Sequence, residues 1–299
     1  GTKFTAPGVS SAGVPDGNGS GLLRIDVPTG SLLNSSLGLG AGVIQASQGR
    51  VLIKARDSIG YDIDPVKINA KYLAAVTRKT FATSAEGINL TSDGDLNISR
   101  IDELNGLRTA SGRIELTVAA GSKINYGTLF AGGARDILFN ADELAVLAGG
   151  SITTAGNVFF RNVTDNRAMR IGDTSTAANT FNVTKQILDS VTRTGANVAA
   201  NVVVGRDSAE SINSGVATVL NYAFSQGLIV KASEIRVPGG AGALSSTSKL
   251  QFETYESTGA GAGNGSILFS ATLSPIIAPT LLATAFRDIS VDATLRSNA

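Results

Sequence analysis

The feature that most constrains the fold of this chain is a series of short runs in which apolar and polar residues alternate. They lie between residues 86 and 154, and most follow a glycine, as in Gly87–Thr91 (GINLT) and Gly112–Val118 (GRIELTV). Successive side chains of a strand point to opposite faces, so each run predicts a strand with one apolar and one polar face. The glycines of these runs recur at a nearly even spacing, at positions Gly94, Gly112, Gly133 and Gly150.

This spacing is too long for hairpins with two-residue loops and too short for strand–helix–strand crossovers. It favours an all-β fold, a parallel β-helix (β-solenoid) whose coils of roughly 19 residues bury their apolar faces against one another. The interval from Gly49 to Gly87 equals that from Gly227 to Gly265, and each is twice the expected coil length. We therefore expect a set of apolar side chains to point inward and stack from coil to coil: Ile114, Leu116, Val118, Ile137, Phe139 and Ile152.

Changes in composition divide the chain into three segments. Residues 1–47 are rich in Gly and Ser and form an N-terminal arm or the first coils; the arm is either a flexible leader or a segment that docks on a neighbouring molecule. Residues 48–273 form the solenoid body, with an irregular insertion near 175–226. Residues 274–299, which contain Pro275 and Pro279, form a C-terminal cap or an assembly segment.

Two stretches of the insertion are ambiguous between helix and strand, 181–191 and 212–224. In the second, Ile212, Val216 and Val219 share one helical face, and Ser211 could serve as the N-cap. The same residues could instead form two short strands with a corner between them.

Composition excludes several kinds of chemistry. The chain has no cysteine and no histidine, which removes disulfides, thiolate sites and the commonest metal ligand and general base. Its 25 basic and 24 acidic residues give a net charge of +1, so no basic face for nucleic acid is expected. The sequence contains no run of about 18 apolar residues, so no transmembrane helix is expected.

The Gly-x-Ile-x-Leu runs, with Asn and Thr at corners, together with Arg170–Asp173 (RIGD) and Val203–Asp207 (VVGRD), resemble filamentous-haemagglutinin-like bacterial surface adhesins. The resemblance runs from about Gly49 to Leu273. It implies a right-handed parallel β-helix that is exported, in many members by two-partner secretion, and displayed at the bacterial surface as a stalk, filament or adhesin.

Candidate sites are few. The closest carboxylate pairs are Asp62 with Asp64 and Asp93 with Asp95; each pair shares one face of an extended segment and could offer oxygen ligands to Ca²⁺. The alternative is that all four are solvated corner residues. Asn89, Asn97 and Asn162 lie in Asn-x-Ser/Thr sequons and are interpreted as corner residues whose side chains bond in a ladder.

Some β-helix enzymes place carboxylates and basic residues on one exposed sheet, so a catalytic face is also considered, from Asp93, Asp95, Arg113, Glu115 and Arg135. Charged residues are expected on the solvent-facing side of every coil in any case.

The favoured expectation is a secreted, non-catalytic structural or adhesive protein without cofactors. It would assemble with copies of itself, head to tail or by strand donation, and host or matrix glycans are the other partners considered. A glycan-processing enzyme and a passive glycan-binding module are the alternatives.

Overall fold

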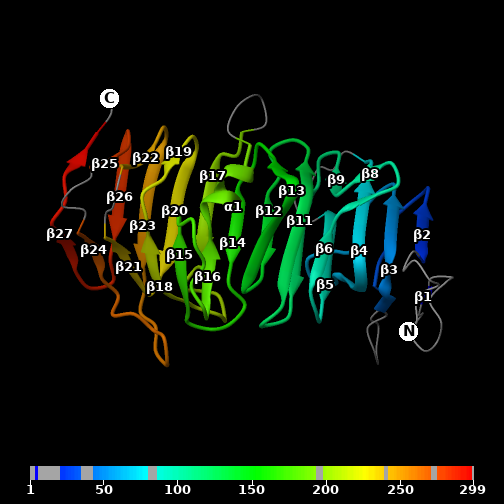
Figure 1. The fold of residues 1–299 in the computed structure, drawn as a ribbon, viewed down its shortest axis with the longest axis horizontal. Coiled ribbons are helices and arrows are strands. Elements are labelled where there is room, and N and C mark those ends of the chain that lie inside the picture. Colours follow the sequence, from blue (N-terminus) through cyan, green and yellow to red (C-terminus); the bar gives the residue numbers. More distant parts are fainter. Residues whose placement is uncertain are drawn as a thin grey trace. The chain divides into compact units, whose positions relative to one another are not determined.

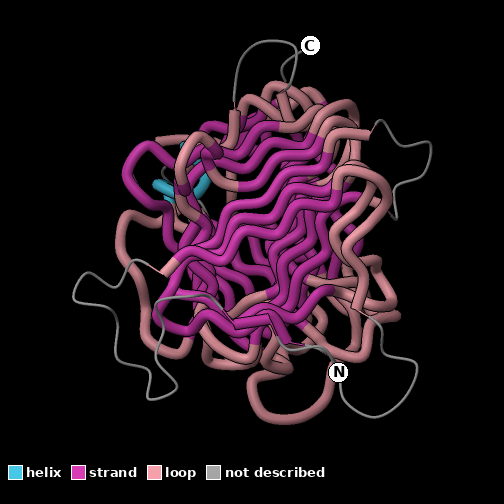
Figure 2. Tube along the Cα trace, turned by 90° about the vertical axis from the view of Figure 1, so that its right-hand side faces the viewer, coloured by secondary structure: helices cyan, strands magenta, loops and turns pink. Residues whose placement is uncertain are grey.

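The computed structural model describes residues 4–5, 21–34, 43–79, 86–192, 198–238, 242–270 and 275–297. Strands make up 57% of the structure and helix 2%, so the expected all-β class is confirmed. The chain forms two compact units, residues 1–156 (unit 1) and 157–299 (unit 2), which are described separately. Within each unit the strands lie side by side in long parallel sheets (Figures 1 and 2).

The strands of unit 1 pair in parallel, apart from one small antiparallel hairpin, β7–β8. They are β1 Phe4–Thr5, β2 Leu22–Val27, β3 Val43–Ala55, β4 Val66–Thr77, β5 Gly87–Ser92, β6 Leu96–Ile98, β7 Arg100–Ile101, β8 Leu104–Asn105, β9 Leu107–Thr109, β10 Arg113–Val118, β11 Lys123–Ala131, β12 Ile137–Asn140 and β13 Glu143–Thr153. The long strands β4 and β11 each pair with several shorter ones, so the chain returns repeatedly to the same sheet.

Apolar side chains of β5, β10 and β12 form part of the core of unit 1, and burial alternates residue by residue along β10. Ile88, Ile114 and Ile137 are register partners across the three strands and are fully buried. All six residues expected to point inward are buried, Ile114, Leu116, Val118, Ile137, Phe139 and Ile152. This part of the prediction is confirmed, because a one-residue slip would have turned the whole set outward.

Unit 2 is built from three parallel sheets that the chain visits in turn. Their orders are β14-β17-β20-β23-β26, β16-β15-β18-β21-β24-β27 and β19-β22-β25-β28. The elements are β14 Val158–Arg161, β15 Arg167–Ile171, β16 Thr180–Val183, α1 Lys185–Ser190, β17 Asn201–Gly205, β18 Ser214–Val219, β19 Ala223–Phe224, β20 Gly227–Ala232, β21 Glu234–Val237, β22 Leu244–Ser246, β23 Lys249–Thr254, β24 Ile267–Phe269, β25 Ile276–Ile277, β26 Thr280–Thr284, β27 Ile289–Val291 and β28 Leu295–Arg296. From β20 onward each coil contributes one strand to each sheet, which is consistent with a β-solenoid.

The strand registers give coils that are mostly longer than the glycine spacing predicts, so the expected coil length is not confirmed. Leu228 pairs with Leu250, and Leu250 pairs with Leu281, so two successive coils differ in length and both exceed the expected one. The glycine spacing misled because the glycines occupy different places in the coil. Gly94 follows β5, Gly112 precedes β10 and Gly150 lies inside β13.

The two stretches that the sequence leaves ambiguous between helix and strand have different structures. Residues 181–191 contain the end of β16 and the helix α1, whose N-cap Thr184 accepts a hydrogen bond from the Ile187 amide at 3.3 Å. Residues 212–224 contain the strands β18 and β19, so the helical alternative is wrong there. The register of β18 against β15 and the alternating burial of Ala217 and Val219 follow strand rather than helix periodicity.

In the segments Arg170–Asp173 (RIGD) and Val203–Asp207 (VVGRD), the strand ends at a glycine whose backbone is in the left-handed conformation. Gly172 has φ +85° after β15, and Gly205 has φ +98° at the end of β17. A Cβ at Gly205 would come 1.9 Å from the Lys231 carbonyl oxygen, so no other residue fits without moving the next coil. The expected N-terminal arm, by contrast, falls mainly outside the described residues.

Candidate functional site

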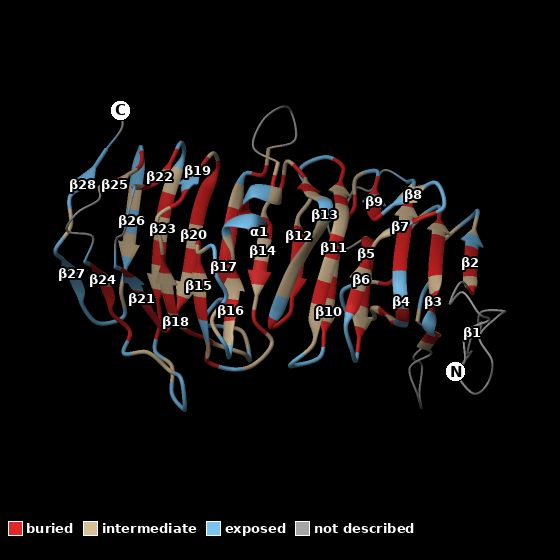
Figure 3. Ribbon diagram, in the orientation of Figure 1, coloured by how far each residue is buried: buried red, intermediate tan, exposed pale blue. Residues whose placement is uncertain are grey.

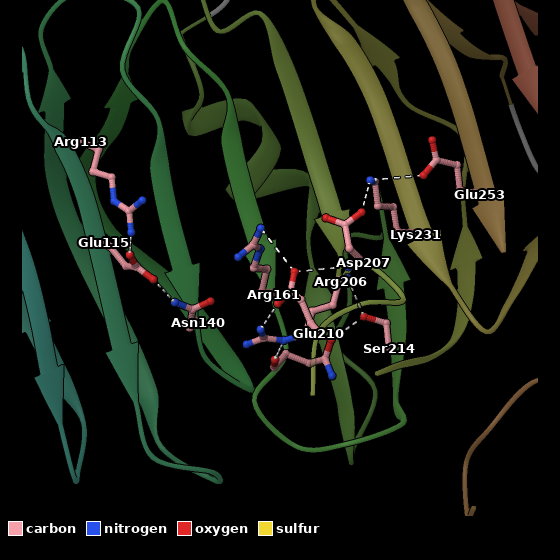
Figure 4. Close-up of polar contacts among 11 residues, drawn as sticks. Arg113, Glu115, Asn140, Arg161, Arg206, Asp207, Glu210, Ser214, Lys231 and Glu253 are labelled. Carbon is pink, nitrogen blue, oxygen red and sulfur yellow. Dashed lines mark hydrogen bonds and ion pairs between the residues drawn. The ribbon is translucent and has the colours of Figure 1, made fainter. Parts of the chain in front are cut away.

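Charged and polar side chains gather in two places, one in each unit (Figure 4). In unit 1 they form the Arg113 cluster, which consists of Asp62, Arg113, Glu115 and Asn140. In unit 2 they form a buried group around Arg206 and, beside it, a triad of Asp207, Lys231 and Glu253. Each group is built from positions that share an outward face or a corner of neighbouring coils.

The Arg113 cluster lies on the outer face of β10. Arg113 and Glu115 occupy alternate positions on this strand, so they share a face and form an ion pair. Asp62, in the turn between β3 and β4, approaches Arg113 with its Oδ1 at 3.1 Å from Nη2. Asn140 on β12 donates through Nδ2 to Glu115 Oε1 at 3.0 Å and to Thr117 Oγ1 at 3.0 Å. The cluster therefore ties three neighbouring segments together.

Burial sets the protonation behaviour of Asp62. It raises the pKa of this carboxyl above its ordinary value of 3.8, and the Glu115 charge acts in the same direction. The Arg113 guanidinium lowers the pKa but does not offset the burial. A carboxyl with a raised pKa beside a second carboxylate is a combination that acid–base catalysis also uses.

This shift predicts a pH-dependent effect of Asp62→Asn. A folded pKa above the unfolded value means that the contribution of Asp62 to stability is present at low pH and is lost as the pH rises through the folded pKa. We expect the melting temperature of the variant to improve relative to the wild type as the pH rises from about 4 to about 6. Thermal unfolding at both pH values measures this, and Glu143→Gln controls for a general charge effect. A difference that does not vary with pH would contradict the assignment.

The polar group of unit 2 is centred on the buried guanidinium of Arg206. Arg206 Nε donates to the Asn162 carbonyl oxygen at 2.6 Å, and Nη1 contacts Glu210 Oε2 at 2.5 Å. Ser214 Oγ accepts from the Arg206 amide at 3.0 Å and donates to Asn162 Oδ1 at 2.7 Å. Tyr255 completes the group by accepting from the Ser214 amide at 2.7 Å. These contacts join side chains from coils that are distant in sequence.

The neighbouring triad places one ammonium between two carboxylates. Lys231 Nζ forms an ion pair with Asp207 and lies 3.2 Å from Glu253 Oε2. Burial lowers the pKa of Lys231, but the hydrogen bond to Asp207 and the two negative charges outweigh it, so the pKa is raised. A shallow hollow adjoins the triad and is lined, besides the triad itself, by Ser208, Thr254, Tyr255 and Thr284.

Three of the four carboxylates considered as metal ligands contact different basic or amide groups. Asp62 faces Arg113, Asp93 pairs with Lys67 at 2.6 Å, and Asp95 Oδ1 accepts from the Lys123 amide at 2.9 Å. The Asp64 carbonyl oxygen closes its own turn by accepting from the Tyr61 amide at 3.1 Å. Across the described residues, no group of three or more His, Cys, Asp or Glu side chains could hold a metal ion.

Of the residues considered for a catalytic face, the structure joins Arg113 and Glu115 in an ion pair. Arg135 Nε instead donates to the Ser111 carbonyl oxygen at 2.9 Å, which fixes a corner. Asp93 and Asp95 are held by the contacts with Lys67 and Lys123. The sequence does not predict Asp62 or Asn140 as members of this face. Of the Arg206 group, the sequence singles out only Asn162, as a sequon corner, and Arg206, within the segment VVGRD.

The sequon asparagines behave as structural residues. Asn97 Oδ1 accepts from Asn125 Nδ2 at 2.8 Å, across neighbouring strands β6 and β11, as a ladder requires. Asn89 is 1% exposed and Asn162 is fully buried, so neither side chain is accessible in the folded protein.

No family model matches the chain, and no curated protein and no solved structure is significantly similar to it. Within the described residues, no helix has the length and apolar character needed to cross a membrane.

Proposed function

We propose that this protein is a non-catalytic structural and adhesive element of a bacterial surface, secreted and folded as a right-handed parallel β-solenoid of the filamentous-haemagglutinin-like kind. Right-handedness is supported by a general rule, since connections between parallel strands of one sheet are right-handed in about 98% of cases. The repeat-like sequence runs and the long parallel sheets support the solenoid itself.

One observation carries the structural role: charged side chains of both units join neighbouring coils to one another. Asp62 with Arg113 and Lys67 with Asp93 do so in unit 1. In unit 2, Lys231 bridges Asp207, just beyond the end of β17, to Glu253 on β23. Each such pair contributes little alone, but a network of them along a sheet stiffens the stack.

The second candidate function is glycan processing, and the Asp62–Glu115 pair is the observation that favours it. Two neighbouring carboxyls, one of which has a raised pKa, could serve as acid and base across a glycosidic bond. In this chain both carboxyls already face the Arg113 guanidinium, which suits an ion-pair network better than a substrate site. A passive glycan-binding module, with the hollow at Lys231 as its contact surface, is the third candidate.

An incubation with acidic polysaccharides tests the non-catalytic proposal. We expect no new reducing ends and no unsaturated uronates, and we expect Asp93→Asn and Glu115→Gln to leave any biological activity in place. Cleavage that the wild type shows and a folded Glu115→Gln variant lacks would establish the enzyme instead. A glycan-array signal without cleavage would identify the passive binding module.

A further inference from the structure

A hollow of about 220 Å³ lies in unit 1 at the corner where β2, β3 and β4 end. Its charged lining residues are Asp26, Lys54, Arg56 and Arg78, and the rest of the lining is apolar. We call it the Arg78 hollow. A water molecule takes up about 30 Å³ of the liquid, so a hollow of this size has room for a small ion. With three cationic side chains and one carboxylate, its lining carries a net positive charge.

The strand register places Arg56 and Arg78 side by side. Val27, Ala55 and Thr77 are partners across β2, β3 and β4, so the residues that follow them hold equivalent places in neighbouring coils. The Arg78 amide continues this pairing by donating to the Arg56 carbonyl oxygen at 3.1 Å. Both arginines are exposed, in the turns that lie beyond β3 and β4 in Figure 3. Two guanidinium groups therefore share one surface of adjacent coils.

Among the described residues, no carboxylate forms a hydrogen bond with either guanidinium group. Asp57 Oδ1 lies 3.8 Å from Arg56 Nε and 3.9 Å from Lys79 Nζ, which is longer than a hydrogen bond. In the same part of the chain, the Arg78 side chain has no hydrogen bond or ion pair. Lys54 is already paired with Glu103. The donors that the hollow offers to a ligand are therefore mainly those of Arg56 and Arg78.

This pair differs from the other charges that join neighbouring coils, which have opposite signs, such as Lys67 with Asp93 and Lys231 with Glu253. Like charges on adjacent strands repel each other and destabilise the sheet. An anion bound between them removes this repulsion, and the planar fork of a guanidinium group matches the oxygens of a phosphate.

The amount of positive charge indicates which anion fits. Two guanidinium groups without a hydrogen-bonded carboxylate match an anion that carries two charges. A phosphate monoester carries between about −1.5 and −2 charges at pH 7, whereas a carboxylate carries only one. Asp26 lies on the rim as the register neighbour of Lys54 and opposes any anion, so a weakly charged ligand gains little.

We propose that the Arg78 hollow binds a dianionic phosphate group, either as inorganic phosphate or as the monoester of a larger molecule. Arg56 and Arg78 donate to the phosphate oxygens, and Lys54 adds positive charge from the side. This inference goes beyond the proposed function and does not depend on it, because a structural, an adhesive or a catalytic solenoid could each carry such a site.

Calorimetric titration of the full chain at pH 8 tests the ligand. The probes are inorganic phosphate, D-glucose 6-phosphate and, as a sugar with a single charge, D-glucuronate. We expect saturable binding of the phosphate probes at one site, and a Kd at least about 10-fold higher for D-glucuronate, which loses a charge-assisted interaction. Tighter binding of D-glucose 6-phosphate than of inorganic phosphate identifies a phosphate ester as the ligand, and equal binding identifies the free ion. Absence of binding by both phosphate probes overturns the proposal, as does D-glucuronate binding of equal strength.

Charge variants test the position of the site. Arg56→Gln and Arg78→Gln each remove donors and should raise the Kd for phosphate about 10-fold or more. Asp26→Asn removes the opposing carboxylate and should lower it. Lys71→Gln is the matched control, since Lys71 is an exposed cation on β4 outside the hollow, and should leave the Kd unchanged. Thermal unfolding confirms that the four variants are folded. Equal weakening by Arg78→Gln and Lys71→Gln would show a general charge effect and overturn the assigned site.

Discussion

Ile137→Asp should abolish cooperative folding of unit 1 or lower its stability by at least about 4 kcal/mol. Ile137 is fully buried on β12 and is the register partner of Ile114 on β10. A carboxylate at this position has no basic partner in a column of apolar side chains, so it must either stay charged without solvent or bind a proton. Thermal and urea unfolding, followed by circular dichroism, measure the loss.

Asn69→Asp is the control for this experiment. Asn69 is exposed on β4, next to the buried Ile68, so the same charge is added to the solvent face of a strand in the same unit. We expect a change within about 0.5 kcal/mol, as for most surface substitutions. An unchanged melting temperature for Ile137→Asp would show that the register of β10 and β12 is wrong.

The fold class could be predicted because the signal is local. The alternation in GRIELTV is enough to place Ile114, Leu116 and Val118 on one face, and the structure buries all three. The length of a coil could not be predicted from the glycines, since turns at different corners carry them. Loops of very different length separate equivalent strands, and no local pattern records where the chain rejoins a sheet.

The hairpin β7–β8 shows another limit of local patterns. Leu52 and Ala74 break the alternation of their strands, and both are fully buried, because Ile101 of the hairpin packs against them. Arg24 with Asp102 and Lys54 with Glu103 form ion pairs that hold the hairpin in place. A consecutive apolar run such as Val51–Ile53 indicates that both faces are covered, but not which segment covers them.

The polar groups were the least predictable feature. Asp62 and Arg113 come from different coils and are far apart in sequence, and so are Asn162 and Ser214. Their proximity depends on the coil lengths, which the sequence does not record. The one available signal was the corner glycine Gly205, which marks where β17 ends but not that the next side chain turns inward.

Arg206→Ala should destabilise unit 2 by about 3–5 kcal/mol, the usual effect of removing one partner of a buried ion pair. The guanidinium holds the Asn162 carbonyl oxygen and Glu210, and its side chain is only 10% exposed. Without it, Glu210 keeps the more distant Arg161, at 3.5 Å, as its charged partner among the described residues, and the Asn162 carbonyl oxygen loses the hydrogen bond from Arg206 Nε. Urea unfolding of the variant measures the loss.

Two further variants separate the charge from the geometry. Arg206→Lys retains the positive charge but cannot bond Asn162 and Glu210 at once, since a single ammonium replaces the planar fork of the guanidinium, so we expect only partial recovery. Glu210→Gln combined with Arg206→Ala should cost less than the sum of the two single substitutions, because residues of one network are coupled. Strictly additive losses would show that Arg206 and Glu210 act independently, and that the group around Arg206 contributes to stability only through packing.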